Sequence, residues 1–165
     1  MAFLLSLVIL LDLGEPLTGI EGVVIKGAIK DYNSGQRITN YSVIAINADD
    51  ASNVVTGVID ENGLYTLRLC DPGVFLLKIS ADQYFLKTSV LNLTGMDHEE
   101  WHSGCAIRVD ASLFPKIDID PIEPFIAPAA FLDFDYSIRE FVWDYEYIEL
   151  QRECQLKAMK LHSTR

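Results

Sequence analysis

The chain has 165 residues, of which half are hydrophobic and 22% are charged. This length and composition exclude wholesale disorder and leave room for one domain with a core of its own. The formal net charge is −11, and thirteen of the 24 acidic residues lie between positions 97 and 149. Such a surface argues against nucleic acid and anionic membranes as electrostatic partners, and it favours solubility or cation binding.

The first segment, residues 1–19, is an apolar run closed by acidic and turn residues. Positions 2–11 are almost all hydrophobic, and Asp12 and Pro16 follow. The run is too short to cross a bilayer, which takes roughly 20 apolar residues, so no stable transmembrane span is predicted. It is typical of the hydrophobic region of a secretory signal peptide, although no Lys or Arg precedes it and no clean cleavage site follows. The alternative is a first strand packed in the core.

Residues 20–113 alternate short apolar runs with Gly, Asn, Asp and Pro turn signals. Gly and Asn supply positive φ and Pro fixes φ, so this spacing is typical of antiparallel strands joined by tight turns. In the first strand Lys26 and Lys30 share one face, while Val23, Ile25 and Ile29 share the other, as in a sheet with one wet side. We therefore predict a mainly β fold, an antiparallel β-sandwich of about seven strands. The expected strands are 23–31, 41–48, 53–60, 64–69, 74–81, 84–87 with 88–93, and 105–113.

Residues 114–165 form a proline-broken, acidic, extended tail that ends in a helix. The tail is rich in Ile and Phe, so we expect it to wrap along a surface and bury these side chains there. From Tyr147 onward the apolar residues fall at helical spacing, which predicts a C-terminal α-helix over 145–161 with Asp144 as its cap. The prolines that interrupt regular structure are Pro115, Pro121, Pro124 and Pro128.

Three cysteines, Cys70, Cys105 and Cys154, are too few and too scattered for a disulfide framework. Cys70 ends one expected strand and Cys105 opens another, so a single bridge between them stays open as an alternative. Buried free thiols are the favoured interpretation.

Residues 23–93 resemble a known family. The segments IKGAIKDYNSGQRITNYSVIAI, TGVIDENGLYTLRL and DPGVFLLKISADQYFLKTSVLNL are similar to the carboxypeptidase regulatory-like domain, also described as transthyretin-like. One position departs, because Gln83 stands where a Gly often precedes the aromatic residue. The resemblance implies a small Greek-key sandwich that serves as an accessory module, frequently in exported or cell-surface bacterial proteins, and it carries over no catalytic residue. The matching residues are Gly27, Ile29, Asp31, Gly35, Thr56, Asp60, Asn62, Gly63, Tyr65, Pro72, Gly73, Ser80, Ala81 and Tyr84.

The stretch 98–102 satisfies the pattern H-E-x-x-H. On a helix, His98 and His102 would project from one face as zinc ligands, and Glu99 could act as general base toward a metal-bound water. A helix here would be about two turns long, capped by Thr94 or Asp97 and ended at Gly104.

Its context weakens the metal hypothesis. Zinc-protease helices are normally long and apolar, whereas the flanking residues here are polar or small. The third ligand would have to come from afar, and Glu123 is only the arithmetical candidate. An exposed acidic loop is the favoured interpretation of this stretch.

Two other patterns are weaker. The pairs Asp118 with Asp120 and Asp133 with Asp135 lack the Gly and bidentate Glu of a calcium loop, so they indicate solvated edges. The alternating aromatic residues could stack on sugars, but such a row more often packs a tail onto its domain. Those residues are Phe141, Trp143, Tyr145 and Tyr147.

The sequence therefore favours a non-enzymatic β-sandwich module of the bacterial cell envelope, exported to the periplasm or cell surface, with a scaffolding, protein-binding or glycan-binding role. Its expected partner is an envelope protein or a glycan, and no cofactor is expected. The alternative is a small zinc metallohydrolase that uses His98, Glu99 and His102. The tail is expected to dock on the sandwich or on a partner.

Overall fold

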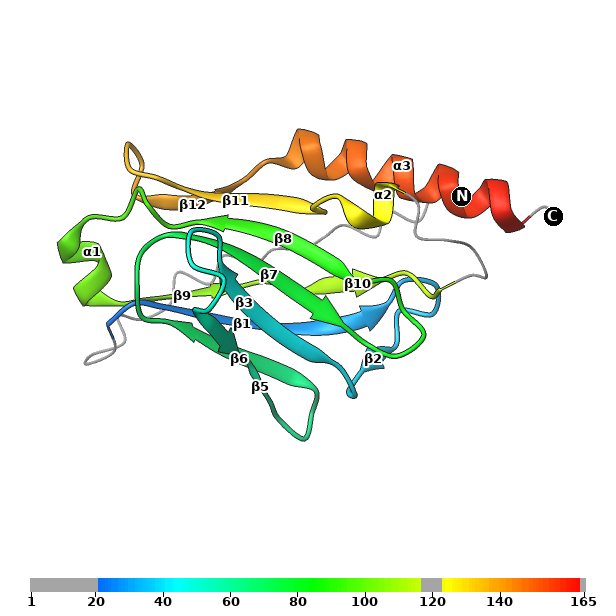
Figure 1. Cartoon of the computed structure of the whole chain (residues 1–165), viewed down its shortest axis with the longest axis horizontal. Helices are drawn as coiled ribbons and strands as arrows, with labels where there is room; N and C mark the ends of the chain where they lie inside the picture. The colour runs from blue at the N-terminus through cyan, green and yellow to red at the C-terminus, as the bar shows by residue number, and fades with distance from the viewer. Residues whose placement is uncertain (1–20, 117–122, 164–165) are drawn as a thin grey trace.

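Two β-sheets packed face to face form the body of the protein, and a long helix lies on the outer side of one of them (Figure 1). The computed structural model describes residues 21–116 and 123–163, so the apolar segment 1–19 and the Asp118–Asp120 pair lie outside the described residues. In the first sheet the strand order is β10-β1-β6-β5, with β2 and β9 also paired to β1. The strands of this sheet are β1 (Val23–Asp31), β2 (Arg37–Ile38), β5 (Val58–Ile59), β6 (Leu64–Leu69), β9 (Cys105–Arg108) and β10 (Ala111–Leu113).

The second sheet has the order β12-β11-β8-β7-β3-β4. From the edge strand β4 the chain passes through Gly57 directly into β5 of the first sheet. The two sheets are therefore joined along this edge of the sandwich by one residue. The mainly β sandwich with a C-terminal helix is confirmed. The strands of this sheet are β3 (Ser42–Asn47), β4 (Val54–Thr56), β7 (Val74–Ser80), β8 (Lys87–Asn92), β11 (Ala130–Asp135) and β12 (Glu140–Trp143).

Strand number and pairing differ from the expectation in part. The described residues form twelve strands rather than about seven, and three pairs are parallel: β1 with β9, β1 with β10, and β8 with β11. The single strand expected over 105–113 is split at Val109 and Asp110. Here the Asp110 carboxylate accepts the Ala28 N–H at 2.7 Å, and the Val109 carbonyl turns inward to accept the Tyr65 hydroxyl at 2.7 Å. A side chain thus replaces one carbonyl of the ladder, which divides β9 from β10.

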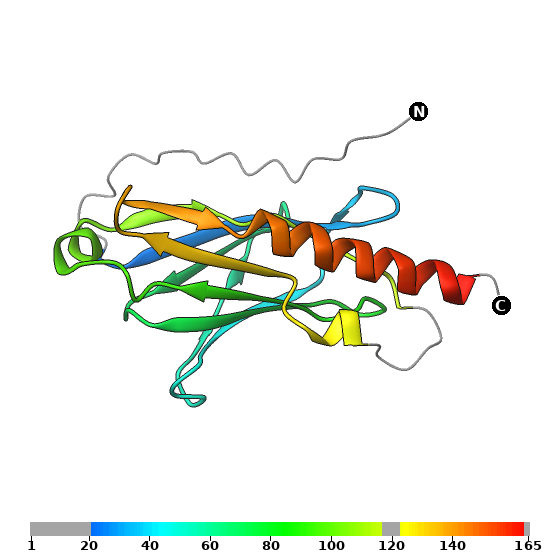
Figure 2. The same cartoon turned by 90° about the horizontal axis from the view of Figure 1, so that it is seen from above.

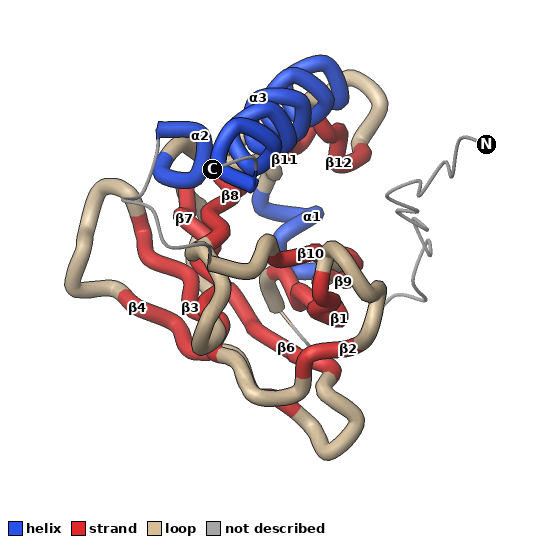
Figure 3. Tube along the Cα trace, turned by 90° about the vertical axis from the view of Figure 1, so that its right-hand side faces the viewer, coloured by secondary structure: helices blue, strands red, loops and turns tan. Residues whose placement is uncertain are grey.

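Part of the tail belongs to the second sheet. β11 pairs with β8, and β12 folds back as a hairpin on β11. The helix α3 (Tyr145–Ser163) follows as expected, and Asp144 caps it by accepting the Tyr147 N–H at 2.9 Å. Figures 2 and 3 show α3 and the short helix α2 (Glu123–Ile126) on the outer side of this sheet, away from β1. The Tyr147 ring meets Phe131 of β11 edge-on, with centroids 4.7 Å apart, which fixes the helix to the sheet.

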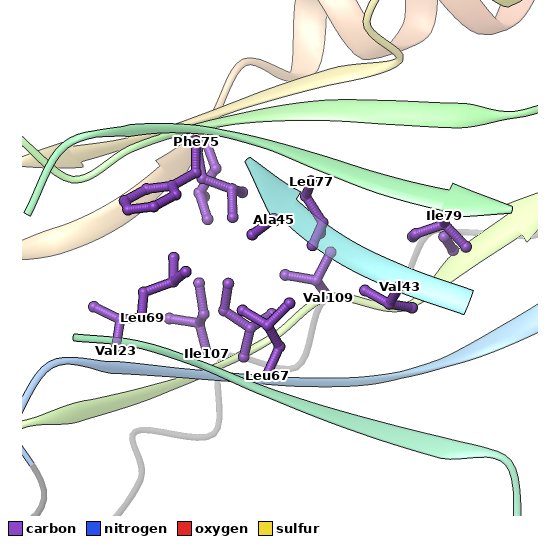
Figure 4. Packing of buried hydrophobic residues seen from close by; sticks show 14 of the residues in the cluster. Val23, Val43, Ala45, Leu67, Leu69, Phe75, Leu77, Ile79, Ile107 and Val109 are labelled. Atoms are coloured by element: carbon purple, nitrogen blue, oxygen red, sulfur yellow. The ribbon is translucent and has the colours of Figure 1, made fainter. Parts of the chain in front are cut away.

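The core lies between the sheets. Inward side chains of β6 and β1 meet those of β3 and β7 in one apolar layer (Figure 4). Tyr65 is fully buried at its centre, and its hydroxyl is satisfied by the Val109 carbonyl. A second apolar cluster of Phe85, Phe114, Phe125 and Ala158 holds α2 and α3 against one end of the sandwich. Burial of the apolar side chains in these two clusters is the dominant stabilising contribution to a fold of this size.

Gly27 stands where β1 passes the Tyr65–Val109 contact. A Cβ at this position would lie 2.0 Å from the Val109 carbonyl oxygen and 2.8 Å from the Tyr65 ring. Only a residue without a side chain fits there. Gln83 has the converse problem, because it adopts φ of +64° with a full side chain.

None of the described helices is long and apolar enough to cross a membrane.

Candidate functional site

The short helix expected around the H-E-x-x-H pattern is formed as α1 (His98–Ser103). Asp97 rather than Thr94 caps it: its carboxylate accepts the Glu100 N–H at 2.8 Å, and the Glu100 carboxylate accepts the Asp97 N–H at 2.9 Å. Gly104 ends the helix, as expected. The reciprocal capping pair explains why six residues hold a helical conformation here.

The two histidines lie side by side on α1. Their rings stack with centroids 3.8 Å apart, and His102 Nδ1 lies 2.8 Å from the His98 carbonyl oxygen. His102 Nε2 also lies 3.7 Å from a Glu21 carboxylate oxygen, an exposed contact. Two imidazoles alone leave half of the four zinc positions to water, whereas catalytic zinc sites use three protein ligands.

No third ligand completes that pair within the described residues, where no group of three His, Cys, Asp or Glu side chains is placed to hold a metal. Glu123, the arithmetical third ligand, begins α2, and Figures 1 and 2 place α1 and α2 at opposite ends of the molecule. The structure therefore does not bring Glu123 to His98. Glu99 is exposed, and its backbone carbonyl accepts the Ser103 hydroxyl at 2.8 Å.

The contacts of α1 tie it to the sandwich. Buried Trp101 donates its indole N–H to the Cys70 carbonyl at 3.2 Å. Arg139, in the turn between β11 and β12, bonds the Glu100 carboxylate at 2.7 Å and the Asp97 carboxylate at 3.4 Å. The Glu100 carboxylate, which hydrogen-bonds the guanidinium, raises the pKa of Arg139. These contacts account for the burial of Trp101 and for the position of the Glu100 carboxylate.

The cysteines and the Asp133–Asp135 pair are the next candidates from the sequence. All three thiols are free, as expected, but Cys70 is exposed and Cys105 and Cys154 are only half-buried, so the expectation of buried thiols is wrong for Cys70 and holds only in part for the other two. Burial and the nearby Glu100 charge raise the pKa of Cys105 to about 11, which keeps this thiol protonated. Asp133 and Asp135 are exposed on β11, and hydrogen bonds from Ser137 lower the pKa of Asp135.

The aromatic row packs the tail onto the sandwich at three of its four positions. Phe141 and Trp143 are buried in the core, and the Tyr147 hydroxyl donates to the Pro128 carbonyl at 2.8 Å. Only Tyr145 is exposed. The expected packing role is confirmed for these three rings.

A cleft at the α2 end of the sandwich is the site that sequence reasoning missed. It has a volume of about 780 Å³ and opens between the start of β3, the end of β7 and α2. Its apolar rim is formed by Leu86 and Ile126, which are 46% and 65% exposed. The lining residues come from separate segments: Asn40, Tyr41, Ser42, Ser80, Ala81, Asp82, Tyr84, Phe85, Leu86, Lys116, Phe125 and Ile126.

The cleft is held in shape by its floor. Phe85 stacks on Phe125 with centroids 4.1 Å apart, and the Phe85 N–H donates to the Phe114 carbonyl at 2.9 Å. The Lys116 N–H donates to the Gln83 carbonyl at 2.7 Å. Because backbone bonds and stacked rings fix both walls, the cleft is preformed.

Polar groups stand at defined places around this floor. The Ser42 and Ser80 hydroxyls bond each other across β3 and β7 at 2.7 Å. Desolvation raises the pKa of Tyr41 to about 12, and its hydroxyl donates to the Gly63 carbonyl at 3.0 Å. Ser80, Ala81 and Tyr84 belong to the pattern of the resemblance, but nothing in the sequence shows that they lie beside Lys116 and α2.

Lys87, at the start of β8, is a further group whose pKa is shifted. Its ammonium donates to the Ser112 carbonyl of β10 at 3.2 Å, so it links the two sheets. Burial lowers the pKa of Lys87 to about 8.

No family model matches the chain, and no curated protein does. Among solved structures, catechol 1,2-dioxygenase of Acinetobacter radioresistens is 15% identical with a TM-score of 0.40, over 64% of this chain and 55% of that one. A type II cohesin–X-dockerin complex from Acetivibrio cellulolyticus is 13% identical with a TM-score of 0.37, over 57% and 58%.

Phospholipase PlaB of Legionella pneumophila in complex with thio-NAD is 13% identical with a TM-score of 0.42, over 66% of this chain and 30% of that one. The chain thus spans a little over half the length of the dioxygenase and about a third of the phospholipase. These likenesses assign neither a family nor a function.

Proposed function

We propose that this chain is a non-enzymatic β-sandwich module, exported to the bacterial cell envelope, that binds a partner protein in the cleft at the α2 end. The observation that carries the proposal is the cleft itself, a preformed hollow of about 780 Å³ with exposed Leu86 and Ile126 at its rim. Exposed aliphatic side chains over a fixed floor suit an apolar side chain of a partner. Asp82 and Lys116 on the same lining can orient that partner.

A glycan is the weaker ligand for this cleft. Sugar recognition uses open aromatic faces, whereas Phe85 and Phe125 stack on one another and are buried. The hydroxyl pair of Ser42 and Ser80 is the feature that favours a glycan, since both groups can bond sugar hydroxyls.

A module role also follows from the resemblance to carboxypeptidase regulatory-like domains, which we retain as part of the proposal. Gln83 adopts a positive φ at the position where that pattern often has Gly. The backbone here therefore has the left-handed conformation that Gly adopts most readily. The apolar start of the chain supports export. The alternative, a zinc metallohydrolase, would need a third ligand beside His98 and His102.

Site-specific photo-cross-linking tests the binding role. A photoreactive residue is placed at Leu86 or Ile126, with Val58, which is 73% exposed on β5 of the other sheet, as the matched control. The proposal predicts one adduct of the same mass from both cleft positions and none from Val58. Equal adducts from all three positions, or none from the cleft, would overturn it.

Two further measurements separate the remaining parts of the proposal. Cell fractionation tests export, and chain confined to the cytoplasm contradicts it. Elemental analysis of untagged protein tests the alternative function. One zinc per chain that is lost in His98→Ala would establish the metal site and remove the non-enzymatic assignment.

A further inference from the structure

The outer edge of β12 offers unpaired backbone groups. β12 is the last strand of the second sheet, and Asp144 donates its N–H to the Phe131 carbonyl at 3.1 Å. Antiparallel bonds alternate along a pair, so the groups of Glu140 and Val142 also face β11. The N–H and C=O of Phe141 and Trp143 therefore face outward, and no group of the described residues bonds them.

This edge is anchored by buried side chains and flanked by exposed ones. The side chains of Phe141 and Trp143 are buried, which anchors the strand. The side chain of Val142, which lies between these two residues in β12, is 41% exposed, and Tyr136 and Ile138 in the turn between β11 and β12 are 60% and 55% exposed. The opposite edge of the same sheet, β4, differs because its chain bends at Gly57 into the other sheet, a device that protects an edge.

The charged residues of β11 and β12 themselves are all acidic. Glu140 stands directly opposite Asp135 on β11, and Asp133 stands opposite Val142. In the described part of the chain neither Glu140 nor Asp133 forms an ion pair, and Arg139, which precedes Glu140, pairs with Asp97 and Glu100 of the α1 region instead. Like charges opposite one another destabilise a strand pair, so a nearby cation would relieve repulsion as well as attract.

A second copy of the chain does not suit this edge. The antiparallel register that joins Phe141 to Trp143 of the other copy, and so uses both outward residues, sets Glu140 opposite Asp144 of that copy, twice. Carboxylates at such positions are how natural edges avoid self-association.

We propose that the β12 edge binds an extended segment of a partner protein that carries Lys or Arg at alternating positions and adds to the second sheet as a further strand. Four backbone hydrogen bonds to Phe141 and Trp143 supply the pairing, and the carboxylates of Asp133, Asp135 and Glu140 select the basic side chains. β12 lies toward the α1 end of the molecule, whereas α2, which lines the cleft, lies toward the other end (Figure 1).

The test uses the full chain and a nine-residue peptide of alternating Lys and Val. The peptide is expected to protect the Phe141 and Trp143 amides from hydrogen exchange in NMR spectra, while an alternating Glu–Val peptide does not. The same Lys–Val peptide methylated on its Val backbone nitrogens should lose binding, because the Val residues stand opposite Phe141 and Trp143 and their N–H groups form the strand pairing.

Charge reversal supplies the matched variants. Glu140→Lys should weaken binding of the Lys–Val peptide by up to about fivefold, in line with exposed ion pairs. Glu61→Lys, the same change in a distant exposed turn, and Leu86→Asp in the cleft should leave binding unchanged. Peptide-induced changes that fall on the cleft instead of β12, equal weakening by Glu140→Lys and Glu61→Lys, or peptide-free dimers joined through β12 would overturn the proposal.

Discussion

Gly27→Ala is expected to destabilise the protein strongly, although Gly→Ala in a strand normally stabilises. The added Cβ would lie 2.0 Å from the Val109 carbonyl oxygen, more than 1 Å inside ordinary contact. That oxygen is not free to move, since the Tyr65 hydroxyl donates to it at 2.7 Å and the Val109 N–H donates to the Lys26 backbone carbonyl at 2.8 Å. β1 cannot retreat either, because β6 and β9 flank it.

The magnitude follows from these contacts. Overpacking in a well-packed core costs about 1–3 kcal/mol, and displacing the Val109 carbonyl from the Tyr65 hydroxyl costs about 1 kcal/mol more. The entropy that Ala removes from the unfolded chain returns at most about 1 kcal/mol. A net loss of about 1–4 kcal/mol in the free energy of unfolding is therefore expected, which most domains survive.

Urea unfolding followed by tryptophan fluorescence measures this loss, with Trp101 and Trp143 both buried as reporters. Gly57→Ala is the control, because its nearest neighbours would be Val43 atoms at 3.4 Å, an ordinary contact. Gly57→Ala should change the free energy of unfolding by less than about 1 kcal/mol. If Gly27→Ala proves as stable as the wild type, the inward Val109 carbonyl and the contact built on it are refuted.

Four other changes follow from the same structure. Tyr65→Phe removes the donor to the buried Val109 carbonyl and should cost about 1–2 kcal/mol in chemical unfolding; no change would mean that water satisfies that carbonyl. Gln83→Gly relieves φ of +64° and should raise the melting temperature, by the equivalent of up to about 1 kcal/mol; a lower melting temperature would contradict the strain. Deleting residues 114–165 removes β11 and β12 and should abolish cooperative unfolding in circular dichroism, whereas unchanged folding would make the tail a separate arm. Lys87→Met bears on pH: the folded chain releases the Lys87 proton near pH 8 and the unfolded chain near 10.5, so the wild type should gain stability relative to the variant as pH rises between these values, and parallel pH profiles would contradict the burial of this amine.

Local features of the fold could be predicted from the sequence. The cap and end of α1 depend on Asp97, Glu100 and Gly104, which all lie within eight residues. The start of α3 depends on Asp144 and the apolar spacing that follows it. The exposed positions of strand β1, Lys26 and Lys30, can be read from the sequence, although Val24 and Ala28 on the same face are buried. In each case the residues that decide the structure are neighbours in the chain.

Long-range pairing could not be predicted in the same way. An alternating run looks the same in a parallel and an antiparallel pair. Nothing in the sequence near Cys105 or Ala130 therefore shows that β9 pairs in parallel with β1, or that β11 pairs in parallel with β8. The division of 105–113 depends on one carboxylate, Asp110, reaching Ala28 across 82 positions.

The candidate sites show the same limit. The H-E-x-x-H pattern is visible because it is local, yet its third ligand candidate, Glu123, lies at the other end of the molecule. The cleft has no local pattern, because β3, β7, the 81–86 loop and α2 each contribute a few residues to it. Its signal exists only after the sheets are assembled.

Both proposed binding surfaces require that the residues after Leu113 complete the sandwich, and hydrogen exchange at the Leu132 amide tests this directly. In β11, alternate N–H groups face β12, so the Leu132 N–H faces β8. Leu132 should exchange only through global unfolding, with the same free energy as Ile25 in β1. Exchange of Leu132 at the rate of an unstructured peptide, with Ile25 protected, would contradict the whole arrangement.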